Sequence, residues 1–168
     1  YTMIEENIWV GNNTKIDKLS TIKAPCIIGE NTEIRPGSYL RGNVIIGDNC
    51  VIGNSVEVKN SIIFDNSQIP HFNYVGDSIL GYHSHLGAGV ILSNLKNDES
   101  NIVIRGIDTN MIKLGSIIGN NVNIGSNSVL YPGTIIGCNT SIYPLTRVRG
   151  IIPSNSIMKD ENNIIEKG

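Results

Sequence analysis

Aliphatic residues recur at every sixth position along most of this chain. Steps of six from Val10 to Val58 meet only Ile, Leu or Val, nine in succession, and a second series from Ile118 to Val148 adds six more. These three residue types make up 50 of the 168 residues. Fifteen such coincidences therefore have a chance probability on the order of 1 in 10⁸, before the choice of phase is counted. The chain contains a six-residue structural repeat.

Between the two series the period continues with single-residue slips. The aliphatic positions there are Ile63, Ile69, Val75, Leu80, Leu86 and Leu92. The position four residues after each aliphatic residue of the two series is always small or β-branched. It reads Thr14, Ser20, Cys26, Thr32, Ser38, Val44, Cys50, Val56, Val122, Ser128, Thr134, Thr140 and Thr146. Such side chains suit a chain that turns tight corners around a narrow interior.

The composition agrees with short strands and frequent turns. There are 30 Ile, 22 Asn and 18 Gly, against 9 Leu and 2 Ala. Ala and Leu favour helices, whereas Ile favours strands and Asn and Gly favour turns. Gly often follows the aliphatic residue, and we expect these glycines to adopt positive φ at the corners. They are Gly11, Gly29, Gly47, Gly53, Gly119, Gly125 and Gly137.

A hexad of one short strand and one turn, three to a coil, gives a triangular prism of parallel strands roughly 4.8 Å apart. The sequence thus predicts one all-β domain over residues 1–168, a single-stranded parallel β-helix of about seven coils. We expect the coils over residues 8–92 and 117–152, a protruding loop over 93–116, and a C-terminal tail over 153–168 that forms a cap or a frayed end. A disordered insertion is the alternative for the loop.

The three cysteines form no CxxC pair and are odd in number, which does not suggest a disulfide framework. Cys26 and Cys50 fall on small interior positions, so we expect them to fill the core.

Charge and hydropathy exclude several partners. The net charge is -2 and the pI is about 5.9, so nucleic-acid binding and a polybasic membrane contact are not expected. No run approaches the roughly 20 apolar residues of a membrane span, and no signal segment stands at the start. We expect a cytoplasmic protein. The first residue is Tyr1 rather than Met, which leaves a preceding segment open.

The repeat resembles that of the hexapeptide-repeat proteins, in which an aliphatic residue is followed by Gly or another small or polar residue, two variable residues and a small one. The resemblance spans roughly residues 8–152. It implies that the β-helix is left-handed, which the period alone does not determine. It also implies assembly as a homotrimer with clefts between neighbouring prisms.

One segment departs from the repeat and carries chemistry. Residues 69–77 read Ile-Pro-His-Phe-Asn-Tyr-Val-Gly-Asp, and they are followed by Leu-Gly-Ala-Gly at 86–89 and Ser-Asn-Leu at 93–95. Together these motifs resemble the acetyltransferase domain of glucosamine-1-phosphate acetyltransferases, which are often fused to sugar-nucleotide pyrophosphorylases and serve UDP-N-acetylglucosamine biosynthesis. The resemblance implies transfer of the acetyl group of acetyl-CoA to the amine of an amino-sugar phosphate.

The resemblance also implies roles for single residues. His71 would be the base that takes the amine proton, a task suited to imidazole, and Asn94 would complete the catalytic site at the sugar. Tyr74 would contact the sugar or phosphate, and Arg35 and Lys59 would hold the phosphate.

The segment Gly87-Ala88-Gly89 would turn close to the substrate or cofactor, and His85 stands where the family has a substrate-binding Asn. Ser100 stands where the family has a loop lysine. For each of these residues an ordinary place on a turn or a solvated surface remains the alternative. Asp77 is expected to fix its own turn by accepting backbone hydrogen bonds.

Two other functions are weighed beside acetyl transfer. The prism could be a non-catalytic oligomerisation or regulatory domain of a sugar-nucleotide pyrophosphorylase-like protein, which the missing loop lysine favours. His71, His83 and His85 also permit comparison with γ-class carbonic anhydrases, which bind zinc through three histidines on this same prism. Their spacing does not resemble that family's pattern, so we expect no metal site.

Overall fold

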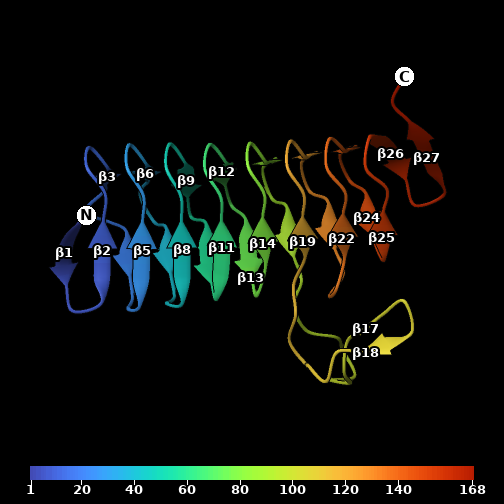
Figure 1. The fold of residues 1–168 in the computed structure, drawn as a ribbon, viewed down its shortest axis with the longest axis horizontal. Helices are drawn as coiled ribbons and strands as arrows, with labels where there is room; N and C mark the ends of the chain where they lie inside the picture. The colour runs from blue at the N-terminus through green and yellow to red at the C-terminus, as the bar shows by residue number, and fades with distance from the viewer.

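The computed structural model describes residues 1–168 and consists of strands and turns, with no helix. The chain winds as a left-handed parallel β-helix of about eight turns, seen from the side in Figure 1. Each turn contributes one short strand to each of three sheets, here named A, B and C. The predicted fold class is confirmed, with about one turn more than the hexads counted in the sequence.

Sheet A contains parallel strands of two or three residues, with one antiparallel strand at its first edge. Its strands are β1 (Thr2–Glu5), β2 (Ile8–Val10), β5 (Cys26–Ile28), β8 (Val44–Ile46), β11 (Ser61–Ile63), β14 (Ile79–Leu80), β19 (Ile117–Ile118), β22 (Ile135–Ile136) and β25 (Ile151–Ile152).

Sheets B and C form the other two faces of the prism. Sheet B holds β3 (Lys15–Ile16), β6 (Glu33–Ile34), β9 (Val51–Asn54), β12 (Gln68–His71), β15 (His85–Leu86), β20 (Asn123–Ile124), β23 (Ser141–Ile142), β26 (Ser156–Asp160) and β27 (Asn163–Glu166). Sheet C holds β4 (Thr21–Ile22), β7 (Tyr39–Leu40), β10 (Glu57–Lys59), β13 (Tyr74–Gly76), β16 (Ile91–Leu92), β21 (Val129–Leu130) and β24 (Arg147–Val148).

The aliphatic residues of the repeat fill the interior. One core cluster of 28 buried residues runs the length of the prism, and Ile16 and Ile22 pack against its first coil. The slipped positions from Ile63 to Leu92 are all buried as well. Cys26 and Cys50 are free thiols within this core, as predicted, and burial raises their pKa to about 12 and about 11 respectively.

The prediction that the glycines after the aliphatic residues adopt positive φ is wrong. None of the seven adopts positive φ. They are needed because a Cβ would strike the next coil: at Gly11 it would lie 2.5 Å from the carbonyl carbon of Gly29, and at Gly53 only 1.6 Å from the carbonyl oxygen of Pro70. The corner between sheets A and B instead takes positive φ at asparagine in seven coils and at His83 in the eighth. The asparagines are Asn13, Asn31, Asn49, Asn66, Asn121, Asn139 and Asn155.

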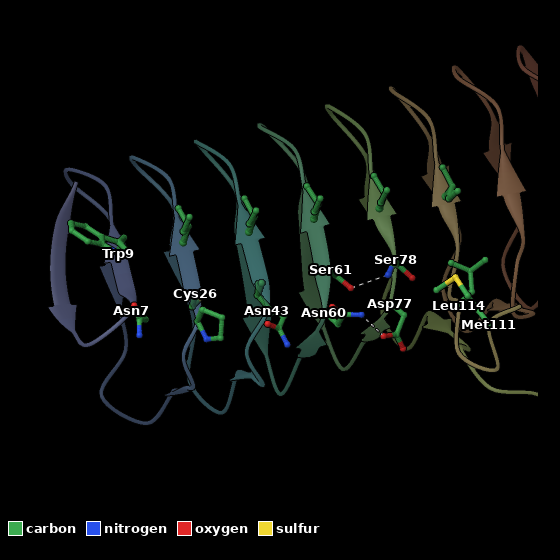
Figure 2. A pocket seen from close by; sticks show the side chains of 17 residues that line it. Asn7, Trp9, Cys26, Asn43, Asn60, Ser61, Asp77, Ser78, Met111 and Leu114 are labelled. Atoms are coloured by element: carbon green, nitrogen blue, oxygen red, sulfur yellow. Dashed lines mark hydrogen bonds between the residues drawn. The ribbon is translucent and has the colours of Figure 1, made fainter. Parts of the chain in front are cut away.

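The outward side of sheet A carries a row of apolar side chains in register. The row reads Trp9, Ile27, Ile45, Ile62, Ile79, Ile117, Ile135 and Ile151. Six of these eight side chains, from Trp9 to Ile117, are exposed in the isolated chain. A groove of about 610 Å³ follows this row, and Figure 2 shows it with Met111 and Leu114 at one end.

The segment between β16 and β19 leaves the prism, as Figure 1 shows. It contains the antiparallel hairpin of β17 (Val103–Ile104) and β18 (Ile107–Asp108). Ile102 is 1% exposed, and a Cβ added to Gly133 would lie only 2.6 Å from its Cγ2. The segment therefore packs on the next coil through a buried side chain.

The coils continue past Ile152. β26 pairs in parallel with β23, Met158 is buried in the core, and β27 folds back antiparallel on β26. Residues 153–168 thus add a further strand to the prism and an antiparallel strand at its end.

The chain forms no helix that is a candidate for spanning a membrane.

Candidate active site

His71 lies at the corner between sheets B and C, where the chain leaves its repeat. Its side chain is exposed, and the following residue, Phe72, adopts φ 53°. The buried Asn73 accepts a hydrogen bond from the main-chain N–H of His71 at 3.1 Å, and its Nδ2 donates to the carbonyl oxygens of Gly87 and Val90 at 2.8 and 3.3 Å. These three hydrogen bonds explain why the bulky, polar Asn73 occupies an interior position that holds a small side chain in other coils.

The segment Gly87-Ala88-Gly89 stacks directly on this corner. The main-chain N–H of Gly89 donates to the carbonyl oxygen of His71 at 3.0 Å. A Cβ on Gly87 would lie 2.7 Å from the Ser126 nitrogen, and Gly89 has φ 73°. Close packing and backbone conformation therefore account for both glycines, and the structure brings the segment next to His71.

A second polar group lies at the opposite edge of sheet C, at its corner with sheet A. Asp77 is its centre, with a side chain that is 8% exposed. Its carboxylate accepts hydrogen bonds from Lys59 Nζ at 3.2 Å, from Asn60 Nδ2 at 2.7 Å and from Asn94 Nδ2. Figure 2 shows Asn60 directed at Asp77. We name Lys59, Asn60, Asp77 and Asn94 the Asp77 cluster.

The surroundings of Asp77 favour its ionised form. Burial by itself raises the pKa of Asp77, but the hydrogen bonds from Asn60, Asn94 and Lys59, together with the Lys59 charge, hold it below the ordinary value. The expectation that Asp77 accepts backbone hydrogen bonds is wrong, because its hydrogen-bond donors are three side chains. A charged side chain with so little exposure requires such partners.

Tyr74 lies on the outward side of sheet C beside the Asp77 cluster. A Cβ on Gly76 would lie 2.6 Å from the Tyr74 hydroxyl and 2.9 Å from Asn94 Nδ2. The Tyr74 hydroxyl and the Asn94 amide therefore meet over Gly76. Phe72 has a different neighbour, since its ring centroid lies 6.2 Å from that of His71.

Arg35 and His85 belong to another face of the prism. Arg35 follows β6 and forms an ion pair with Glu33 at 3.2 Å. His85 lies in β15, with Nδ1 3.2 Å from Asn123 Oδ1. Both strands belong to sheet B, whereas Tyr74 lies on sheet C. Within one chain the predicted site residues thus divide between the His71 corner, the Asp77 cluster and sheet B.

The three histidines do not converge. His83 has φ 55° at the corner between sheets A and B, His85 projects from sheet B, and His71 lies at the next corner. No group of three or more His, Cys, Asp or Glu side chains in the chain could hold a metal ion.

Asn60 and the apolar row of sheet A are not among the residues predicted from the sequence. Asn60 could not be assigned because its partner, Asp77, lies one coil away and the register there depends on slipped hexads. The row does have a signal. Ile-Ile pairs recur about every 18 residues at 27–28 and 45–46, and again at 62–63, 117–118, 135–136 and 151–152. In each pair the second side chain points inward and the first outward.

Comparison with known proteins agrees with this architecture. The family described as GMPPB C-terminal domain matches residues 22–111. The chain belongs to this family. A second family, the hexapeptide repeat of succinyl-transferase, matches residues 116–142. The predicted resemblance to hexapeptide-repeat acetyltransferases is confirmed.

Two curated relatives extend the similarity. The bifunctional sugar-1-phosphate nucleotidylyltransferase/acetyltransferase of Sulfurisphaera tokodaii is 38% identical over 146 residues, covering 84% of this chain and 35% of the relative. The bifunctional protein GlmU of Methanococcus aeolicus is 32% identical over 187 residues, covering 99% and 46% respectively. The chain therefore spans less than half the length of these relatives.

A solved structure shares the fold. A mutant of AntD, an N-acyltransferase from Bacillus cereus, in complex with dTDP-4-amino-4,6-dideoxyglucose and coenzyme A, superimposes with a TM-score of 0.59 at 19% identity. The match covers 94% of this chain and 82% of AntD.

Proposed function

We propose that this chain transfers the acetyl group of acetyl-CoA to the amine of an amino-sugar phosphate, with glucosamine-1-phosphate as the first acceptor to test. The observation that carries the proposal is the pair of polar groups at the two edges of sheet C. His71 lies at one edge, the Asp77 cluster at the other, and Tyr74 stands between them. The names of the bifunctional relatives, one of which includes an acetyltransferase, support the same chemistry.

In the proposed reaction the neutral amine attacks the thioester carbonyl carbon. A C–N bond forms, the C–S bond breaks, and His71 accepts the proton that the nitrogen loses. That proton then passes to the departing thiolate, so that coenzyme A leaves as a thiol. His71 suits this role because its ring is exposed while its backbone is bonded to Asn73 and Gly89.

Cations near the acceptor would bind its phosphate. Lys59 Nζ contacts Asp77 on one side, while the side chain stays 21% exposed, so its other donors can reach a ligand. In the loop, Lys96 Nζ lies 2.5 Å from Ser100 Oγ. Lys96 would therefore supply a positive charge beside the position where the resembled family has a loop lysine.

Arg35 and His85 enter this proposal only if two copies share a site. They project from sheet B, whereas Lys59 and Tyr74 belong to sheet C. A homotrimer in which sheet B of one prism adjoins sheet C of the next would combine them. Light scattering should give the mass of three copies. A monomer at all concentrations would contradict a shared site.

A non-catalytic role is the second candidate. The matched family is described as a C-terminal domain, and Lys59 and Asn94 are already engaged by Asp77. Such a domain would assemble with its copies without binding acetyl-CoA.

Measurement of coenzyme A release separates the two candidates. Acetyl-CoA should be consumed with amino-sugar phosphates and much more slowly with the matching free amino sugars, because the phosphate contributes charge-assisted hydrogen bonds. Calorimetry with acetyl-CoA alone provides the companion measurement. Absence of binding at millimolar ligand would contradict acetyl transfer and favour the non-catalytic candidate.

A further inference from the structure

One interior position recurs at the corner between sheets B and C, directly before each strand of sheet C. The parallel register of that sheet aligns the residues at this position from one coil to the next. We name these residues the corner column: Ser20, Ser38, Val56, Asn73, Val90, Ser128 and Thr146. Asn73 is the only amide among them, so its hydrogen bonds can be compared with those that the repeat itself makes.

Three serines of the corner column make the same hydrogen bond. The hydroxyls of Ser20, Ser38 and Ser128 each donate to a carbonyl oxygen of the next coil, at 3.0, 2.8 and 3.0 Å. The accepting carbonyls belong to Arg35, Gly53 and Tyr143. Each acceptor stands three residues before the next member of the column. This bond is therefore part of the repeat and indicates no special function.

Asn73 makes the same bond and two others. Its Nδ2 donates to the carbonyl oxygen of Gly87 at 2.8 Å, and Gly87 likewise stands three residues before Val90. The same Nδ2 also donates to the carbonyl oxygen of Val90 at 3.3 Å, and Oδ1 accepts from the main-chain N–H of His71 at 3.1 Å. The bond from His71 has no counterpart at the three serines, so it is specific to this coil.

The hydrogen bonds around Asn73 form a closed cycle. Asn73 bonds to His71 and to the turn that begins at Gly87, and Gly89 of that turn donates to the carbonyl oxygen of His71 at 3.0 Å. Both main-chain polar groups of His71 are thus held, while its ring is exposed. Because the allowed rotamers of a side chain depend on φ and ψ, a fixed main chain restricts the direction of the ring.

We propose that Asn73 is a positioning residue, which orients His71 for proton transfer by holding its main-chain N–H. The inference rests on the proposed acetyl transfer for the role of His71. Asn73 is only 3% exposed, so it acts from behind the site and does not touch the substrates. Its loss should slow the chemical step and leave substrate binding nearly unchanged, because orientation of a base contributes to the transition state.

Replacement of Asn73 by serine separates the two kinds of bond. Asn73→Ser keeps a hydroxyl that can bond to Gly87, as Ser38 bonds to Gly53, but it removes the acceptor for the His71 N–H. The fold should be kept, and kcat should fall about 10-fold or more. The KM values for acetyl-CoA and the amino-sugar phosphate should stay within about twofold.

A second variant and a control accompany this test. Asn73→Thr, which places the side chain of Thr146 at the same position, should lower kcat to a similar extent. Ser128→Ala is the matched control, because it removes the 3.0 Å bond to Tyr143 from the same column without touching His71. Its kcat should equal that of the wild type. Thermal unfolding of each variant checks that the fold is kept.

Hydrogen exchange at the main chain provides a measurement that does not require activity. The His71 N–H should exchange about 10-fold faster or more in Asn73→Ser, because its acceptor is gone. The N–H of Phe72, which donates to the carbonyl oxygen of Asn54 at 3.0 Å, should keep its rate. Unchanged exchange at His71 would overturn the proposal, whatever the activity.

The outcomes distinguish this inference from the proposed function. Faster exchange at His71 with an unchanged kcat in Asn73→Ser would overturn the positioning role while acetyl transfer stands. Equal losses of kcat in Asn73→Ser and Ser128→Ala would also overturn it, since any lost bond of the column would then suffice. A higher KM at constant kcat would assign Asn73 to binding instead. A wild-type chain that acetylates no acceptor overturns the proposed function, and the exchange rates then decide whether Asn73 holds His71.

Discussion

Two corners of the prism each carry an exposed histidine, and their surroundings differ. His83 replaces the asparagine that adopts positive φ in seven other coils. The turn of the repeat alone therefore accounts for the backbone conformation of His83. His71 lies where the repeat is interrupted, with Asn73 buried behind it and Gly89 bonded to its carbonyl oxygen. Exposure is common to both histidines and therefore does not favour either as a catalytic residue. The interruption of the repeat is the observation on which His71 is proposed.

Turnover gives the sharpest test of this comparison. His71→Ala should lower kcat by roughly 10²–10⁴-fold, the usual contribution of a general base. His83→Asn should leave kcat unchanged, because asparagine occupies that position in the other coils. Coenzyme A release at saturating acetyl-CoA measures both. Equal activity in the two variants would remove His71 from the proposed mechanism.

Stability at the His71 corner should depend on Gly53. A Cβ there would lie 1.6 Å from the carbonyl oxygen of Pro70, so Gly53→Ala should destabilise the fold by about 1–3 kcal/mol through overpacking. Gly150→Asn is the control, because the space around Gly150 is open and its φ is 80°, a conformation that asparagine tolerates. Urea unfolding compares them. Similar midpoints would show that the coils can separate without cost.

Acid should lower the stability of the fold through Asp77. The folded-state pKa of Asp77 is lowered, so its contribution to stability is present above its unfolded pKa of about 3.9 and is lost as pH falls through the folded value. Asp77→Asn removes that contribution, and its stability should therefore change less than that of the wild type as the pH falls below about 4. Thermal midpoints across pH 2–7, read at about half-unit steps, give the two slopes. If the thermal midpoints of the wild type and Asp77→Asn fall equally with pH, Asp77 does not make this contribution to stability.

The smallest expected effect concerns the fold at His83. His83→Asn should raise the free energy of unfolding by about 0.3–0.5 kcal/mol, because asparagine adopts positive φ more readily than histidine. Asn121 Nδ2 and Asn139 Oδ1 are already hydrogen-bonded at 3.0 Å in neighbouring coils, so a further asparagine fits the same column. A loss of stability would show that the His83 side chain makes a favourable contact of its own.

The sequence predicted the prism because one interior residue per hexad is a strong physical constraint. Ile63 and Leu80 were located even across slipped hexads, since the narrow core accepts little besides aliphatic side chains. The candidate site was harder to predict. Contacts such as Asn94 to Asp77 join different coils, and their register follows from the slips rather than from the period.

Two errors have a common physical cause. Positive φ was expected at glycine, yet Gly11 is required by the close approach of Gly29. Asp77 was expected to bond to its own backbone, yet Lys59 and Asn60 of the preceding coil bond to it. In both cases the neighbouring coil determines the residue, and a rule based on local turn preferences does not include that neighbour.

The pairing of β14 with β19 has a consequence for how such a chain can change. Leu80 and Ile118 are direct partners across two adjacent coils although the whole protruding loop intervenes in sequence between β16 and β19. Because each coil contacts only the next, the stack can accept an insertion at one junction without altering the spacing of any other. New binding surfaces can therefore be acquired by lengthening one turn, while the scaffold that orients them stays the same.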